Sequence, residues 1–179
     1  MVTEYARARD VLMHRIGAVF EPDAFAGLYP SATPPRVCLG FPTSEPPFYA
    51  AVDEIVDAAR TTGGVSMGHA QVDFTLRVWL HARHADLKTA SDTLLAYIDA
   101  VFGCVLADPQ LCWSVDAALP SIEAAGTAAD SSKRYIAAAS VAVECSVYSA
   151  CPAALASIVQ ASNAAIRQGE EVADEGDGN

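Results

Sequence analysis

Apolar residues recur every three to four positions in three parts of the chain, and this spacing predicts amphipathic helices. The clearest covers residues 86–106, where one apolar stripe runs until Asp108 and Pro109 break the pattern. Residues 4–20 show the same period. A third helix is expected over residues 152–168, with a proline in its first turn and a glycine directly after its end.

Strict alternation of apolar and polar residues predicts two long strands, over residues 71–82 and 133–149. Each should bury one face and leave the other for water or for a partner. Shorter strands are expected over residues 36–41 and 111–123, the second with Pro120 near a sheet edge or a bulge.

Proline, glycine and small residues predict loops over residues 23–35, 61–68 and 124–132. The segment 48–56 fits both periods, because its apolar residues make a helical stripe and also alternate imperfectly. The pattern alone slightly favours a helix there.

The order of these elements predicts an α+β fold with a small, mostly antiparallel sheet flanked by helices and an extra C-terminal helix. Nothing in the sequence divides the chain, so residues 1–168 are expected to form a single domain. Residues 169–179 carry five acids and no base. They are expected to form a solvated acidic tail.

The composition allows a sizeable core, since 52% of the 179 residues are hydrophobic. The net charge is −11 and the isoelectric point is about 4.6. This charge disfavours binding to nucleic acid backbones and to anionic membrane surfaces. No apolar run approaches the roughly 18 residues of a membrane span, so no membrane partner is expected.

The five cysteines are expected to be reduced and mostly buried as small hydrophobic residues. Their number is odd, their spacing fits no zinc pattern, and the charged first residues do not resemble a secretory signal. They are Cys38, Cys104, Cys112, Cys145 and Cys151.

No pattern in the sequence predicts a catalytic site or a cofactor. The chain lacks the glycine-flanked nucleophile turn of hydrolases and the glycine-rich loops that bind phosphates. His81, His84 and Asp86 remain an alternative as metal ligands. A solvated strand end is favoured instead, because a metal needs three or four converging ligands and strand offsets of three face opposite sides.

Two residues on the polar faces of the long strands are not explained by core packing. Trp79 either packs under a helix or anchors an interface, and these alternatives are equally open. Glu144 either faces water or pairs with Arg134 or with a neighbouring subunit.

Four segments in order form a recognisable pattern: PPFYAAVDEI, VDFTLRVWLHARHADLKTASDTLLAYIDAVF, WSVDAALPSIEAAGTAAD and SKRYIAAASVAVECSV. Most characteristic are a strand ending in VW before a polar break and a helix, and the closing strand RYIAAASVAVE. The stretch from Pro47 to Tyr148 thereby resembles the tail terminator proteins of long-tailed bacteriophages, also called minor tail or tail completion proteins.

The resemblance implies a virion protein of the tail or neck, assembled in the host cytoplasm, with an α+β fold and no enzymatic activity or cofactor. Members form a homo-hexameric ring that caps the tail tube, stops its polymerisation and joins it to the head-side connector. Genomic DNA passes through the lumen without specific binding. The resemblance also favours a strand over residues 48–56.

A closed ring needs two different complementary patches on each subunit. We expect one patch on the polar face of strand 71–82, while the glycine-rich loop 61–68 would reach a neighbouring ring such as the tube. An acidic chain suits a channel that must not hold the DNA passing through it. The candidate interface residues are Arg77, Trp79, His81, Gly63, Gly64 and Glu144.

Two alternatives to a tail terminator remain open from the sequence. One is a neck, head-closure or other tail-associated ring protein. The other, of a different class, is a small enzyme or ligand-binding domain, because a fold alone does not decide function. An enzyme would show a pocket with converging polar groups, whereas a terminator would form rings.

Overall fold

The computed structural model describes residues 4–40, 42, 46–52, 57–61 and 69–150. This part of the chain forms three helices and six strands. In order they are α1 (Glu4–Val19), α2 (Pro22–Leu28), β1 (Arg36–Leu39), β2 (Phe48–Val52), β3 (Asp57–Thr61), β4 (His69–His84), α3 (Leu87–Leu106), β5 (Ala117–Ala129) and β6 (Tyr135–Ala150).

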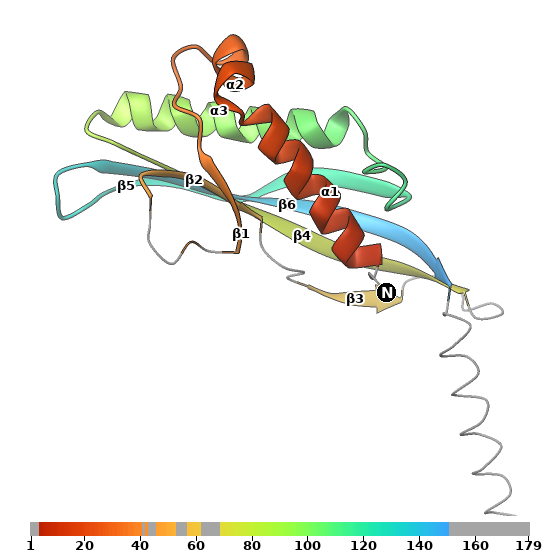
Figure 1. The fold of residues 1–179 in the computed structure, drawn as a ribbon. Coiled ribbons are helices and arrows are strands. Elements are labelled where there is room, and N and C mark those ends of the chain that lie inside the picture. The colour runs from red at the N-terminus through yellow and green to blue at the C-terminus, as the bar shows by residue number, and fades with distance from the viewer. Residues whose placement is uncertain (1–3, 41, 43–45, 53–56, 62–68, 151–179) are drawn as a thin grey trace, which may run out of the picture.

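The strands form one mixed sheet in the order β1-β2-β4-β6-β5, and β3 also pairs with β4 (Figure 1). Strands β4 and β6 are antiparallel along their whole length, from His69 opposite Ala150 to His84 opposite Tyr135. The only parallel pair among the described strands is β1 with β2. The described sheet therefore ends in a short strand, β1, on one side and in the 13-residue strand β5 on the other.

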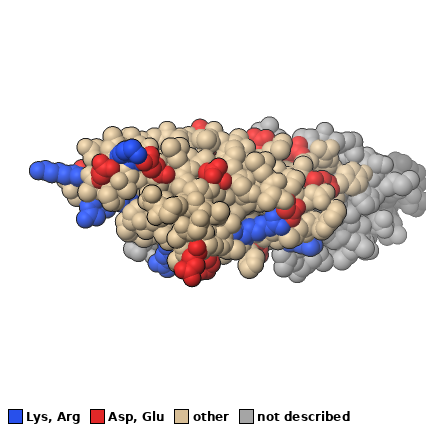
Figure 2. Space-filling model, turned by 90° about the horizontal axis from the view of Figure 1, so that it is seen from above, with Lys and Arg blue, Asp and Glu red and all other residues tan. Residues whose placement is uncertain are grey.

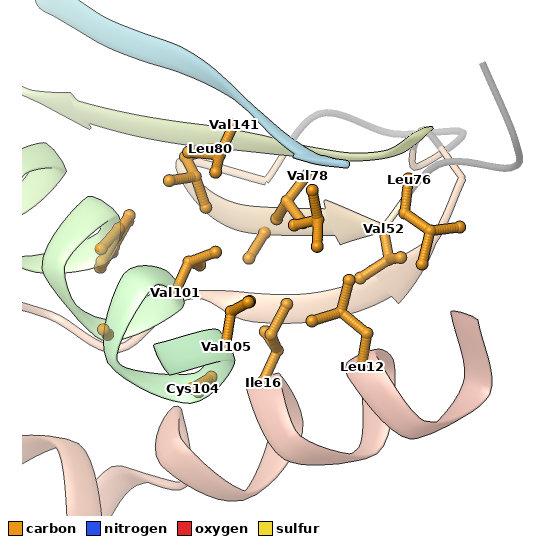
Figure 3. Close-up of a cluster of buried hydrophobic side chains, with 14 of the residues drawn as sticks. Leu12, Ile16, Val52, Leu76, Val78, Leu80, Val101, Cys104, Val105 and Val141 are labelled. Atoms are coloured by element: carbon orange, nitrogen blue, oxygen red, sulfur yellow. The ribbon is translucent and has the colours of Figure 1, made fainter. Parts of the chain in front are cut away.

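The three helices cover one face of the sheet (Figure 1), and the core lies between the two layers. Leu12 and Ile16 of α1 and Val101 of α3 point toward Val78 of β4 (Figure 3). All four side chains are fully buried. Burying a side chain of this size stabilises a fold by about 2 kcal/mol, so this layer is the main source of stability.

Helix α3 begins where Asp86 accepts hydrogen bonds from the backbone N–H of Thr89 at 2.7 Å and from its hydroxyl at 2.8 Å. These bonds cap the helix and lower the pKa of the Asp86 carboxyl. By length and composition α3 is also apolar enough to cross a membrane, with a mean hydropathy of 1.3 in its most apolar window, so the expectation that no apolar stretch approaches this length is wrong. Half of that window is buried inside the protein.

The predicted α+β fold with helices flanking a small sheet is confirmed, and so are the predicted helices at 4–20 and 86–106 and the two long strands. Residues 48–52 form a strand, as the family resemblance favours over the helical pattern. The predicted loop over 23–35 is wrong, because it contains most of α2. This short helix begins with a proline in its first turn and anchors itself through the buried side chain of Phe25.

The predicted boundary of the fifth strand is also wrong. Residues 107–116 form a turn rather than the start of a strand, and β5 continues through the predicted loop 124–132 as far as Ala129. Nearly all of β5 is exposed, so its small residues carry no apolar alternation to mark a strand. Pro120 does lie in an edge strand, near a bulge after Ile122, as predicted.

Several predictions fall outside the described residues. They are the remainder of the strand at 53–56, the predicted loop 61–68 apart from Thr61, the C-terminal helix at 152–168 and the acidic tail at 169–179. Thr61 itself ends strand β3 and is not part of a loop.

Candidate functional site

The face of the sheet opposite the helices, called here the outer face, carries the predicted interface residues of β4. Alternation places Arg77, Trp79 and His81 on this face, while their neighbours Val78 and Leu80 enter the core. On β6, Ser140 and its alternate neighbours share the outer face, because they lie opposite the outer residues of β4.

Arg77 forms a two-pronged ion pair with Glu123 of β5. Its Nε lies 2.5 Å from Glu123 Oε2 and its Nη2 lies 2.7 Å from Oε1. Ser140 Oγ, in the intervening strand β6, donates to Glu123 Oε2 at 2.6 Å. The bonds from Arg77 and Ser140 hold the pKa of the Glu123 carboxyl below its usual value. One carboxylate therefore joins three strands.

The sequence did not identify Glu123 as the partner of Arg77. The pairing depends on the bulge between Ile122 and Ala124, which turns Glu123 toward the outer face. The only sequence signal was that Glu123 is the single charged residue in β5.

Trp79 is half-buried and lies beside Arg77, whose guanidinium carbon is 5.5 Å from the centre of the indole ring. The ring forms one wall of a mostly apolar hollow of about 370 Å³ on the outer face. The opposite walls come from the last part of β5 and the first part of β6, including Gly126, Ile136 and Ala138. The sequence therefore located one wall of this hollow but not the hollow itself.

His81 stacks on Tyr49 of β2, with ring centres 4.8 Å apart and an angle of 11° between the planes. The two residues are direct register partners. Only 8% of His81 and 7% of Tyr49 is exposed. His81 is therefore a packing residue within the subunit and offers little surface to a neighbour.

Glu144 is exposed on the outer face, opposite Thr75 of β4 and Leu119 of β5. Of the three alternatives for Glu144, the pairing with Arg134 is wrong, because Arg134 precedes the far end of β6, ten residues and roughly 30 Å away along the strand. Contact with a neighbouring subunit stays a prediction. Gly63 and Gly64 lie outside the described residues.

Strand β5 forms a long exposed edge of the sheet. Every residue from Ser121 to Ala129 is exposed, and only Glu123 among them is charged. Proteins usually protect such edges with lysines, prolines or short strands, because unpaired backbone groups bind other strands. In β5 the protective devices are Pro120, which lies before the exposed part, and the bulge at Ile122–Ala124, after which the exposed edge continues to Ala129.

The turn at 107–116, which enters β5, holds an unusual backbone. Leu111, Cys112 and Trp113 have φ angles of 44°, 54° and 60°, which are left-handed values at three consecutive non-glycine residues. Each such residue costs about 1–2 kcal/mol. Leu111 is buried, whereas Trp113 is 81% exposed, the most exposed of the large apolar residues described.

Asp108 holds this turn together. Its carboxylate accepts from the backbone N–H of Cys112 at 3.0 Å and of Gln110 at 3.1 Å, and it forms an ion pair with Arg15 of α1. These partners lower the pKa of Asp108, the Cys112 N–H most of all. The strained turn is thus fixed to the helix layer.

A second hollow, of about 490 Å³, lies between α1 and this turn and is lined by Arg7, His14, Arg15 and Cys112 among others. Arg15 Nη2 lies 3.0 Å from Cys112 Sγ. Among the described residues no hydrogen bond joins the Cys112 thiol to His14, so the thiol has no base bound to it.

The other described cysteines are free and at least partly buried, as predicted, and Cys112 is the exposed exception. Burial raises the pKa of the Cys145 thiol to about 12 and also raises those of Cys38 and Cys104. Such thiols are inert at neutral pH.

The described residues contain no group of three or more His, Cys, Asp or Glu side chains placed to hold a metal ion. His84 accepts through Nδ1 from the backbone N–H of Asp86 at 3.0 Å, and the Asp86 carboxylate caps α3. His81 lies in its stack on Tyr49. The three residues considered as ligands therefore serve separate structural roles.

The helix-covered side of the protein presents scattered charges. Figure 2 shows acidic and basic side chains dispersed over it, with broad uncharged areas between them. One polar link between the helices is the bond from Tyr29 Oη to Asp99 Oδ2 at 2.5 Å. Partial burial and this bond raise the pKa of Tyr29 to about 12. No basic stripe of the kind that binds nucleic acid appears in Figure 2.

The sequence matches no protein-family profile, and it matches no curated protein. The candidate functional surfaces are therefore defined by geometry: the outer face with its hollow, the exposed edge of β5, and the turn that carries Trp113. Apolar hollows, free strand edges and exposed tryptophans are features of docking surfaces.

Proposed function

We propose that the chain is a structural protein of a bacteriophage virion, a tail terminator. It forms a homo-hexameric ring that caps the tail tube, stops its polymerisation and joins it to the head-side connector. It belongs in the tail or neck of the particle and assembles in the host cytoplasm. The proposal rests on the family resemblance of residues 47–148 together with the surfaces described above.

The observation that carries the proposal is the exposed edge of β5. Nine consecutive residues, Ser121–Ala129, are exposed along a strand whose single charge is engaged by Arg77. A free edge of this length invites pairing with another chain, and a protein that must stay monomeric would be expected to block it. In a ring, each subunit binds its neighbours through such surfaces, so the exposed edge would serve as a subunit contact.

The acidic balance of the chain also supports the proposal. A net charge of −11 gives a six-subunit ring a strongly negative field. DNA carries one negative charge for about every 1.7 Å of its axis, so such a ring repels it. A channel that DNA must traverse without binding needs this property.

Assembly of purified tail tube protein tests the function directly. Tubes grown with a small molar amount of this chain should stop at shorter and more uniform lengths, with the protein at one end of each tube. In control reactions with bovine serum albumin, the tubes should continue to grow. Tubes that grow unchanged at saturating amounts of the chain would contradict the proposal.

The same tube assay distinguishes a tail terminator from the nearest alternative, a head-closure ring. A head-closure ring would bind isolated head-side connectors and leave tube growth unchanged. A terminator acts on tubes in the absence of any connector.

A further inference from the structure

Two features of the chain, a projecting side chain and an open hollow, lie toward different ends of β5. The first is Trp113, which is 81% exposed on a turn of three left-handed residues fixed by Asp108. A backbone this strained persists where its surroundings impose it, and such sites commonly serve a function. Here the strain has one evident result, which is that a large aromatic side chain stands out from the surface.

The second feature is the hollow beside Trp79. Its volume of about 370 Å³ is roughly twelve times the 30 Å³ share of a water molecule, which leaves room for an indole ring. Small residues form most of its walls, and a side chain added at Gly126 would meet no atom within 4 Å. The hollow is open because its residues are small, and the ring of Trp79 offers a surface for aromatic packing.

The two features belong to opposite ends of the sheet. The turn with Trp113 precedes β5 at Ala117, whereas the hollow is lined by β5 residues near Gly126. Nine strand residues separate these points by roughly 30 Å. In Figure 1 the turn after α3 lies at the right and the β5–β6 connection at the far left. Trp113 therefore cannot reach the hollow of its own subunit.

We propose that Trp113 of one copy of this chain inserts into the Trp79 hollow of the next copy. A projection and a hollow at opposite ends of one molecule make a head-to-tail contact, which is the type that generates rings. Buried tryptophans in fitted pockets dominate the binding energy of many interfaces. The inference rests on the proposed ring and specifies the contact that would close it.

Charge favours the same arrangement. The turn at 107–116 carries two acids and no base, and one of the acids, Asp108, is ion-paired with Arg15, which leaves Asp116. The connection at 130–134, which leads to the hollow residue Ile136, carries two bases and one acid, Asp130, which is ion-paired with Arg83. Asp116 and Arg134 are both exposed. The two surfaces that would meet therefore have opposite signs.

Two variants of the full-length chain test the contact. Trp113→Ala removes the projection, and Gly126→Leu fills the hollow at a position where the subunit has space. Each should weaken self-association by about 100-fold in sedimentation velocity and leave the circular dichroism spectrum unchanged. Leu95→Ala, at a 60% exposed position on α3, is the matched control and should assemble like the natural chain.

Mixing the two variants gives the most specific result. Trp113→Ala retains the hollow and Gly126→Leu retains Trp113, so one productive contact is possible. The equimolar mixture should give a 1:1 heterodimer that grows no further. Tryptophan emission of the natural chain should also move to shorter wavelength with rising concentration, as Trp113 leaves water.

Three outcomes would overturn the inference. If the Trp113→Ala variant forms the same rings as the natural chain, the proposed contact is excluded, and the proposed function is unaffected. A mixture that stays monomeric would show that Trp113 does not bind the hollow. A natural chain that remains monomeric while the hollow binds the apolar dye anilinonaphthalene sulfonate, with loss of binding in Gly126→Leu, would make it a small-ligand site.

Discussion

Arg77 in β4 and Glu123 in β5 form an ion pair that reaches across the strand between them. The two-pronged contact, at 2.5 and 2.7 Å, passes over β6, where Ser140 adds a third bond to the same carboxylate. The centre of the sheet is thereby connected to its exposed edge. This connection fixes one side of the outer-face hollow, because Arg77 also lies against the ring of Trp79.

Removing either partner of this pair should lower the stability of the domain by a small amount. Arg77→Ala and Glu123→Gln should each reduce the free energy of unfolding by about 1 kcal/mol, since partial exposure to water limits such pairs. Urea unfolding of both single variants and the double variant measures their coupling. The exposed Arg36→Ala serves as control, and fully additive losses in the double variant would contradict the pairing.

The stability of the domain should fall in mild acid. Asp108 and Glu123 have pKa values lowered by their bonding partners, so the folded state favours their ionised forms. Their contribution is complete above the unfolded values of 3.8 and 4.5 and is lost as pH falls through the lower folded values. Urea unfolding at pH 7 and pH 3 measures this loss.

The difference between the natural chain and Glu123→Gln should shrink over the same range, because protonation of Glu123, in the unfolded chain first and then in the folded one, removes the advantage of its ionised form. A difference that is constant from pH 7 to pH 3 would argue against an ionised Glu123 as the source of the effect.

Core packing predicts a large contrast between two leucines on helices. Leu12 is fully buried between α1 and the sheet, whereas Leu95 on α3 is 60% exposed. Leu12→Ala should cost about 2–5 kcal/mol, and Leu95→Ala less than about 0.5 kcal/mol. Thermal or urea unfolding of the two variants measures both losses. Equal effects would mean that α1 does not pack on the sheet as described.

The left-handed turn predicts a substitution that raises stability. Trp113 has a φ angle of 60° and little buried surface, so Trp113→Gly should relieve strain and raise the free energy of unfolding by about 1 kcal/mol. Lys133, also at φ 60°, offers the matched case, and Lys133→Gly should gain a similar amount. Loss of stability in Trp113→Gly alone would indicate that its side chain packs within the subunit.

Periodicity in the sequence identified the elements that bury the most apolar surface. Strands β4 and β6 and helix α3 carry long alternating or helical patterns because one side of each meets the core. The α+β class follows from these three. Strand β5 gave no such signal, since an exposed edge of alanine, glycine and threonine buries too little to select an alternating pattern.

The candidate surfaces were only partly predictable for a related reason. Arg77 and Trp79 were identified because large polar and aromatic residues stand out in an alternating strand. Their partner Glu123 depends on a bulge and on the pairing of β5 with β6, neither of which leaves a local mark. The conformation of Trp113 depends on a local bond from the Cys112 N–H to Asp108 and on the tertiary ion pair of Asp108 with Arg15. No glycine or asparagine in the turn indicates a left-handed conformation from the sequence.

The mass of assembled particles tests the central claim most directly. The full-length chain should be measured by mass photometry over a concentration series, alone and after incubation with purified tail tubes, with the ends of the tubes imaged by electron microscopy. The account predicts one closed species of about six times 18.7 kDa, free in solution or at tube ends only, with a sixfold ring in projection. A chain that stays monomeric at every concentration and never occupies a tube end would contradict it.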